Sequence, residues 1–168
     1  EKVLTQVAGT SMAKDPHNPN LIDYTDPGTK FKLSFPASWS TRDIGGSDVR
    51  LLAGPGNGDL MSVRVDTLDT GSSAAPTQDS LEPYLNAIVQ GDGVKIITRD
   101  KIQMGNLPGW YYVYTFTDSS SKQEGIHAQY FIIRGNQLYS IVFQALPLDD
   151  FHKLATTYQQ VANSIRFY

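Results

Sequence analysis

The chain has 168 residues, of which 40% are hydrophobic and 18% are charged, and its formal net charge is −3. A chain of this length forms one ordinary domain that buries about 70% of its unfolded surface, and this hydrophobic content excludes wholesale disorder. It has no cysteine, which excludes disulfides, thiolate metal sites and cysteine nucleophiles. Its acidic balance provides no sequence-wide basic field, so we expect no nucleic-acid partner.

The N-terminal region, residues 1–26, is expected to form an irregular arm, because Pro16, Pro19 and the asparagines beside them would break a helix. Residues 27–168 are expected to form a single domain. The apolar runs have the length of strands, so no membrane span is predicted. The chain begins at Glu1 instead of methionine, which is typical of a mature or trimmed protein. In that case any signal or lipid-carrying cysteine would have been upstream of Glu1.

Three strands and a helix are predicted in the first half. Residues 31–35 alternate apolar and polar side chains, and Pro36 ends that strand because proline has no N–H to donate. Residues 49–53 and 60–66 are expected to pair across a turn at residues 54–59, whose Asn-Gly pair favours a hairpin.

The helix follows a polar loop at residues 71–77, with Asp79 or Ser80 as its N-terminal cap. Its predicted buried stripe is Leu81, Tyr84, Leu85 and Ile88.

The second half is expected to supply four more strands. They cover residues 94–98, with a further piece near 101–103, and then residues 110–117, 128–133 and 138–145. The strand at 110–117 is apolar on both faces, which is typical of a central strand that is covered on both sides. Its aromatic face is Trp110, Tyr112, Tyr114 and Phe116, which we interpret as core instead of a platform for stacking nucleic-acid bases.

The last element is a helix from Asp149 or Asp150, as its cap, to about Asn163. Its apolar stripe is the clearest periodic signal in the chain: Phe151, Leu154, Tyr158, Val161 and Ile165. Two amphipathic helices and a sheet that is apolar on both faces predict an α+β fold, an α/β/α sandwich around a mainly antiparallel sheet.

The order and spacing of several segments resemble the PsbP-like domain family. The first is the lead with Tyr24 and Asp26, followed by the strand at 31–35 with Pro36 and Trp39 after it. The second is the strand that ends in Arg64-Val65, together with the helix that follows it. The others are Gly109 with the aromatic pair after it, the run at 135–141 and the closing run at 163–167. The resemblance covers roughly Tyr24 to Tyr168. The long basic N-terminal region by which plant members of the family dock is not matched.

The resemblance implies the same sandwich fold in a non-enzymatic protein. Family members are extracytoplasmic in bacteria, where many are lipoproteins, or lie in the thylakoid lumen; photosynthetic members assist the oxygen-evolving photosystem, and a distant nuclear relative binds a small GTPase. We therefore expect an extracytoplasmic binding or assembly module that docks to an unidentified protein and needs no cofactor. It could be tethered by an N-terminal lipid anchor that was removed, and the thylakoid lumen is the alternative location.

No residue pattern predicts a catalytic site. His17, His127 and His152 are far apart in sequence, so a metal site built from them would need long-range convergence. Asp66 and Asp69 could bind a cation, whereas Asp149 and Asp150 favour a helix terminus.

Neither the serines nor the glycine-rich loops complete a known motif. Ser119, Ser120 and Ser121 have no nucleophile elbow around them, and the turn at 54–59 lacks the ending of a phosphate loop. No catalytic or cofactor-binding residue is therefore assigned, and a metal site is left open. The glycine-rich loops at 43–48, 54–59 and 71–77 are candidates for binding.

Two alternative functions stay open. One is a small-ligand or cation-binding protein that uses a cleft between the sheet and a helix, which predicts a pocket with converging polar groups. The other is an unrecognised hydrolase, which predicts a buried histidine–carboxylate pair beside a nucleophile.

Overall fold

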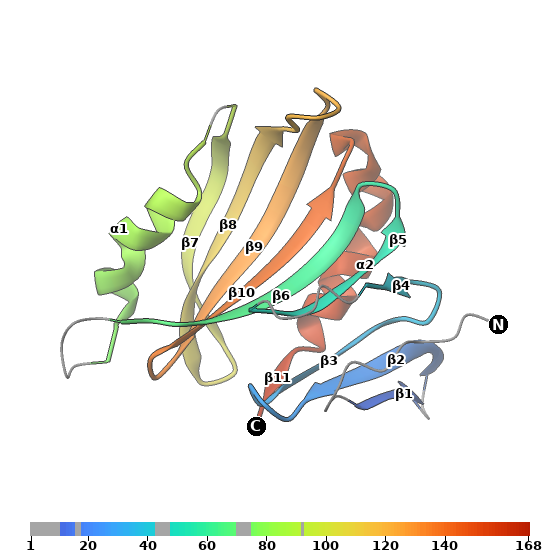
Figure 1. Cartoon of the computed structure of the whole chain (residues 1–168), viewed down its shortest axis with the longest axis horizontal. Coiled ribbons are helices and arrows are strands. Elements are labelled where there is room, and N and C mark those ends of the chain that lie inside the picture. Colours follow the sequence, from blue (N-terminus) through green and yellow to red (C-terminus); the bar gives the residue numbers. More distant parts are fainter. Residues whose placement is uncertain (1–10, 16–17, 43–47, 70–74, 92) are drawn as a thin grey trace.

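The computed structural model describes residues 11–15, 18–42, 48–69, 75–91 and 93–168. This part of the chain contains two α-helices, one short 3-10 helix and eleven strands, which form two antiparallel sheets (Figure 1). The architecture is the predicted α+β sandwich. One helix covers one face of the larger sheet, and the other helix and the smaller sheet cover the opposite face.

The larger sheet has seven strands. In spatial order they are β4 (Ser40–Thr41), β5 (Val49–Gly56), β6 (Asp59–Thr67), β10 (Gln137–Ala145), β9 (Glu124–Arg134), β8 (Leu107–Thr117) and β7 (Lys95–Met104). The predicted hairpin at the Asn-Gly pair is confirmed, with Asn57 in the left-handed conformation that such turns favour (φ 58°). The two pieces predicted around residues 94–103 are one strand, β7, which is irregular between Ile96 and Thr98.

The smaller sheet corrects the prediction of an irregular arm. Its order is β1 (Ser11–Asp15), β2 (Asn18–Asp26), β3 (Phe31–Pro36) and β11 (Arg166–Phe167). Residues 18–26 pair with β3 and bury Ile22 and Tyr24 completely in the core, so tertiary pairing overrides the local helix-breaking signals. Residues 1–10 of the predicted arm lie outside the described residues.

Helix α1 (Gln78–Ile88) packs on one face of the larger sheet, against Trp110 and Tyr112 of β8. Its cap is Thr77 and not Asp79 or Ser80 as predicted. The Thr77 hydroxyl accepts the Ser80 N–H (3.2 Å) and the Ser80 hydroxyl accepts the Thr77 N–H (2.8 Å), which is a reciprocal capping box.

The predicted stripe of α1 is only half right. Leu81 and Leu85 are buried, together with Val89 just after the helix, whereas Tyr84 and Ile88 are 48% and 45% exposed. The buried face follows a spacing of four residues, and Tyr84 and Ile88 lie on the flank beside it.

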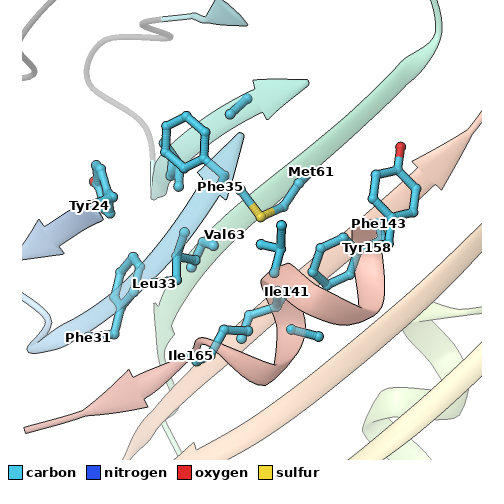
Figure 2. Packing of buried hydrophobic residues seen from close by; sticks show 14 of the residues in the cluster. Tyr24, Phe31, Leu33, Phe35, Met61, Val63, Ile141, Phe143, Tyr158 and Ile165 are labelled. Atoms are coloured by element: carbon cyan, nitrogen blue, oxygen red, sulfur yellow. The ribbon is translucent and has the colours of Figure 1, made fainter. Parts of the chain in front are cut away.

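Helix α2 (Phe151–Asn163), preceded by the 3-10 helix η1 (Leu148–Asp150), covers the other face together with β3. Its predicted stripe is confirmed, because Tyr158, Val161 and Ile165 are buried and Phe151 and Leu154 pack against the core. Figure 2 shows how side chains from β2, β3, β6, β10 and α2 meet in this core. Neither described helix is long and apolar enough to cross a membrane.

The predicted cap of α2 needs a correction. Asp150 occupies the N-cap position, but its side chain makes no capping hydrogen bond. Its carboxyl group is hydrogen-bonded to Asp59 of β6 instead. Asp149 belongs to the 3-10 turn before the helix, where it is exposed.

Candidate functional site

A cleft of about 730 Å³ lies between the C-terminal half of α2 and the turn that joins β7 to β8. It is the kind of sheet–helix cleft that the ligand-binding alternative requires, and its volume is within the range of small-molecule sites. Its apolar lining is Ile102, Met104, Leu107, Tyr130, Ile165 and Phe167. These side chains pack against the main core, so the floor of the cleft is continuous with the interior of the protein.

Two arginines line this cleft, and among the described residues no aspartate or glutamate lines it. Arg134, at the end of β9, donates to the carbonyl oxygen of Lys30 (3.2 Å) and to the main-chain oxygen of Tyr168 (2.7 Å), the last residue of the sequence. Arg166 of β11 donates to two backbone carbonyl oxygens within its own segment, those of Asn163 and Ile165, both at 2.7 Å. The two carbonyl oxygens hold the guanidinium of Arg166 in place without neutralising its charge.

The histidines predicted as possible ligands do not come together in the described structure. His127 is half-buried in β9, His152 is exposed on α2, and His17 lies outside the described residues. The Nε2 atom of His127 is 2.7 Å from Oε1 of Gln144, whose amide nitrogen donates to a backbone carbonyl oxygen. Because Oε1 can only accept, Nε2 of His127 carries the proton.

Among the described residues, no carboxylate is hydrogen-bonded to His127. Its Nδ1 atom is 2.8 Å from the hydroxyl oxygen of Tyr114, and that oxygen also lies 2.7 Å from Oε1 of Gln129. Burial lowers the pKa of His127, so the ring is neutral at physiological pH. This polar chain holds β8, β9 and β10 together, and it lacks the carboxylate that the hydrolase alternative requires.

The structure describes both carboxylates that were predicted as a possible cation site. Asp66 accepts from Nε of Arg64 at 2.9 Å and is therefore engaged in an ion pair, while Asp69 is exposed at the end of β6. Among the described residues, no three histidines or acidic side chains lie close enough together to hold a metal ion.

Asp59 is a buried acid that the sequence analysis missed. Burial and the neighbouring Asp150 carboxyl group raise its pKa to about 6, while its Oδ1 accepts the N–H of Leu146 at 3.0 Å. No sequence signal distinguishes it, because Asp59 lies in the predicted turn and its acidic neighbour is 91 positions further along the chain. The pair joins β6 to the start of α2.

The predicted glycine-rich loops are only partly visible. Residues 43–47 and 70–74 lie outside the described residues. The turn at 54–59 borders a hollow of only about 100 Å³, which is small for a ligand site. The prediction that the aromatic strand belongs to the core is confirmed for Trp110, Tyr112 and Tyr114, which are buried, whereas Phe116 is only half-buried.

The face of the larger sheet that carries α1 is incompletely covered. Helix α1 covers parts of β8, β9 and β10, but side chains further across this face are only half-buried. On β6, Met61 and Val63 point toward α2 and are fully buried, whereas Ser62 points to the α1 side and is half-buried. We call this region the open face and define it by Leu52, Leu60, Ser62 and Val142, which the strand register places side by side.

Tyr84 and Ile88 border the open face. The opposite flank of α1 is turned toward β7, because Asp79 pairs with Lys101 and Glu82 with Arg99. A rotation of 100° per residue then directs Tyr84 and Ile88 away from β7, toward β10 and β6.

An electrostatic interaction supports this placement of the α1 flank. Asp66 raises the pKa of Arg64 on β6, and Asp48 and Tyr84 add smaller contributions. Tyr84 therefore lies within electrostatic range of Arg64, which is two positions after Ser62 on the same strand.

The fold resembles three solved structures over most of the chain. Cyanobacterial PsbP from Synechocystis sp. PCC 6803 superposes with a TM-score of 0.63 and 14% identity, covering 89% of this chain and 93% of that chain. The Saccharomyces cerevisiae Ran-binding protein Mog1p gives 0.55 and 10%, covering 94% and 96%. PA94, a protein of unknown function from Pseudomonas aeruginosa, gives 0.55 and 16%, also covering 94% and 96%.

The chain thus has the PsbP-like fold. A scan against models of protein families finds no match, and neither does a search of curated proteins. At these identities the structural likeness concerns the fold, so the function has to be argued from the surfaces of this chain.

Proposed function

We propose that this protein is a non-enzymatic binding module that docks to another protein through the open face. The observation that carries the proposal is the half-exposed sheet surface bordered by Tyr84 and Ile88. Large apolar side chains exposed side by side favour association with a protein surface. The fold is compatible with such a role, since one structure that shares it is described as a Ran-binding protein.

The chemistry of the open face selects an apolar partner surface. Leu52, Leu60 and Val142 are apolar and Ser62 is uncharged, while the nearby Arg64 is paired with Asp66 and Asp48. A partner therefore needs no compensating charge, and its affinity should depend only weakly on salt. This weak salt dependence is a signature of docking at the open face.

The test is site-specific photo-crosslinking in cells that express the protein, followed by affinity measurements with the purified partner. A crosslinker in place of Ile88 is expected to capture a defined protein. Ile88→Lys should then weaken the affinity at least tenfold, because the open face would carry an unpaired charge against an apolar surface.

The matched control is Ile97→Lys, which makes the same substitution at an isoleucine that is 62% exposed in β7, outside the open face. It should leave the affinity unchanged. Equal loss in both variants, or no loss in either, would refute docking at the open face.

We also propose an extracytoplasmic location, with the thylakoid lumen as the alternative. The support is the family resemblance of the sequence and the PsbP-like fold. Fractionation of the source cells tests this location, and recovery of the protein with cytoplasmic markers would contradict it.

A second candidate function is the binding of a small ligand, which the cleft beside α2 favours. The hydrolase alternative has less support, because His127 is hydrogen-bonded to Tyr114 and Gln144 and, among the described residues, to no carboxylate.

A further inference from the structure

We propose that the cleft between α2 and the β7–β8 turn binds a short acidic peptide segment in an extended conformation. The proposed contacts are the peptide carboxylate with Arg134 and Arg166, and an apolar peptide side chain with the floor of the cleft. This site is distinct from the open face, since it lies on the α2 side of the sheet, and the inference does not depend on docking there.

Charge is the first argument. Arg50, Arg64 and Arg99 each form an ion pair with a carboxylate, whereas none is found for Arg166 among the described residues. Arg166 lines the cleft together with Arg134, on a protein whose net charge is −3. The uncompensated guanidinium of Arg166 favours an anion at this site, and its planar donors match a carboxylate.

The guanidinium groups are also held in place before a ligand arrives. Arg134 bridges the main-chain oxygens of Lys30 and Tyr168, and Arg166 is fixed by two carbonyl oxygens of its own segment. A guanidinium has five N–H donors, so donors remain on both residues for a ligand. This ordering reduces the entropy that binding would otherwise cost.

Amide side chains provide the second argument. Four of them line the cleft: Gln103, Asn106, Gln159 and Asn163. Each amide can both donate and accept a hydrogen bond, so together they complement the N–H and C=O groups of a peptide backbone. An alkyl chain would leave these hydrogen-bonding groups without a partner. Gln159 already donates to Asn163 at 2.9 Å, so this part of the rim is ordered.

The floor of the cleft supplies the third argument. Tyr130, Met104 and Leu107 are only partly buried although they pack against the main core. Tyr130 is supported from one side by the ring of Tyr111, whose centroid is 4.7 Å away. A peptide side chain such as leucine would cover this floor and remove apolar surface from water.

The experiment uses the whole chain and two probe peptides that differ in one group. The first is acetylated leucyl-aspartyl-leucine amide and the second is its asparagine analogue, with binding followed by calorimetry and by NMR shifts of the Met104 methyl group. We expect the aspartyl peptide to bind about tenfold or more tightly, because hydrogen bonds to a charged group are the stronger ones. Raising the salt concentration should reduce this difference.

Two variants locate the binding site. Arg166→Gln should remove most of the preference for the aspartyl peptide, whereas the control Arg42→Gln, at an exposed arginine outside the cleft, should leave it unchanged. Asn106→Asp places a carboxylate in the exposed turn, so it should weaken binding of the aspartyl peptide more than that of the asparaginyl peptide. Because this turn residue is exposed, folding should not be affected.

Several results would overturn the proposal. They are equal affinities for the two peptides, no binding of either, an unchanged preference in Arg166→Gln, and tighter binding of dodecanoate, which would indicate a lipid-like ligand. Two crossed measurements separate failure of this site from failure of the open face. They are the binding of the open-face partner to the Arg166→Gln variant and the binding of the aspartyl peptide to the Ile88→Lys variant.

Discussion

Asp26 and Arg50 form a bidentate ion pair that joins the two sheets. Nε of Arg50 donates to Oδ2 of Asp26 at 2.7 Å, and its terminal nitrogen donates to Oδ1 at 3.1 Å. Asp26, at the end of β2, is completely buried and also accepts from Thr29 and Gly28, so all of its charge is compensated within the protein. Arg50, on β5, accepts the hydroxyl of Tyr24 at its carbonyl oxygen.

We predict that Asp26→Asn destabilises the fold by about 3 kcal/mol, because it removes the buried carboxylate that pairs with Arg50. Urea unfolding measures this loss. Asp79→Asn is the control, because it breaks an exposed pair with Lys101 and should cost less than about 1 kcal/mol. If both variants lost the same free energy of unfolding, burial would not make the Asp26–Arg50 ion pair more important for stability than the exposed pair.

The same pair should contribute to acid sensitivity. Burial by itself would raise the pKa of Asp26, but Arg50, Thr29 and Gly28 together lower it. A lowered carboxyl pKa stabilises the fold above the ordinary pKa of about 3.9, and this contribution is lost as the pH falls through the folded-state value. Wild-type stability should therefore fall below pH 4 more steeply than that of Asp26→Asn.

His127 should destabilise the protein as the pH falls from about 7 toward 5. Burial lowers its pKa in the folded state, so below the ordinary value of about 6.5 the unfolded chain binds the proton more readily. His127→Gln should abolish this part of the pH dependence in urea unfolding. The exposed His152 provides the control, since His152→Gln should leave the pH profile unchanged.

Asp59 should act in the opposite direction over the same pH range. Burial and the Asp150 carboxyl group raise its pKa to about 6, so its stabilising contribution is present at lower pH and is lost as the pH rises through 6. Asp59→Asn should stabilise the protein at pH 8 by about 1 kcal/mol and have less effect at pH 5. Destabilisation at both pH values would mean that the hydrogen bond to Leu146 is lost in the variant.

Substitutions at two residues of α1 should distinguish a loss of folding stability from a loss of binding at the open face. Leu85 is completely buried, so Leu85→Ala should cost about 2–5 kcal/mol of unfolding free energy. Ile88 is 45% exposed, so Ile88→Ala should cost no more than about 0.5 kcal/mol and still weaken docking at the open face. A large stability loss in Ile88→Ala would show that this side chain is structural.

Much of the fold could be predicted from local patterns. Alternation along β6 correctly placed Met61 and Val63 on the buried side, and the stripe of α2 correctly identified Tyr158 and Val161. These predictions succeed because a strand or helix that buries one face must repeat its apolar residues at the corresponding period. The prediction that Tyr84 is buried was wrong, because the width of the buried face of α1 depends on how much of the sheet this helix covers.

The candidate sites were less accessible to sequence reasoning. Arg134 and Arg166 are 32 positions apart and have no motif between them, so only the meeting of β9 and β11 with α2 creates the cleft. Adjacent Ile96 and Ile97 break the alternation of β7 and could have indicated the irregular edge.

The sequence by itself determined a self-sufficient, acidic, cysteine-free domain with the α/β/α sandwich architecture, because composition and periodicity depend on residues that are close in the chain. Only the tertiary structure decided that β2 belongs to a sheet, that Asp26 meets Arg50, and that two arginines border one cleft. These features depend on the register and the relative placement of distant segments, which follow from the free energy of packing the whole chain.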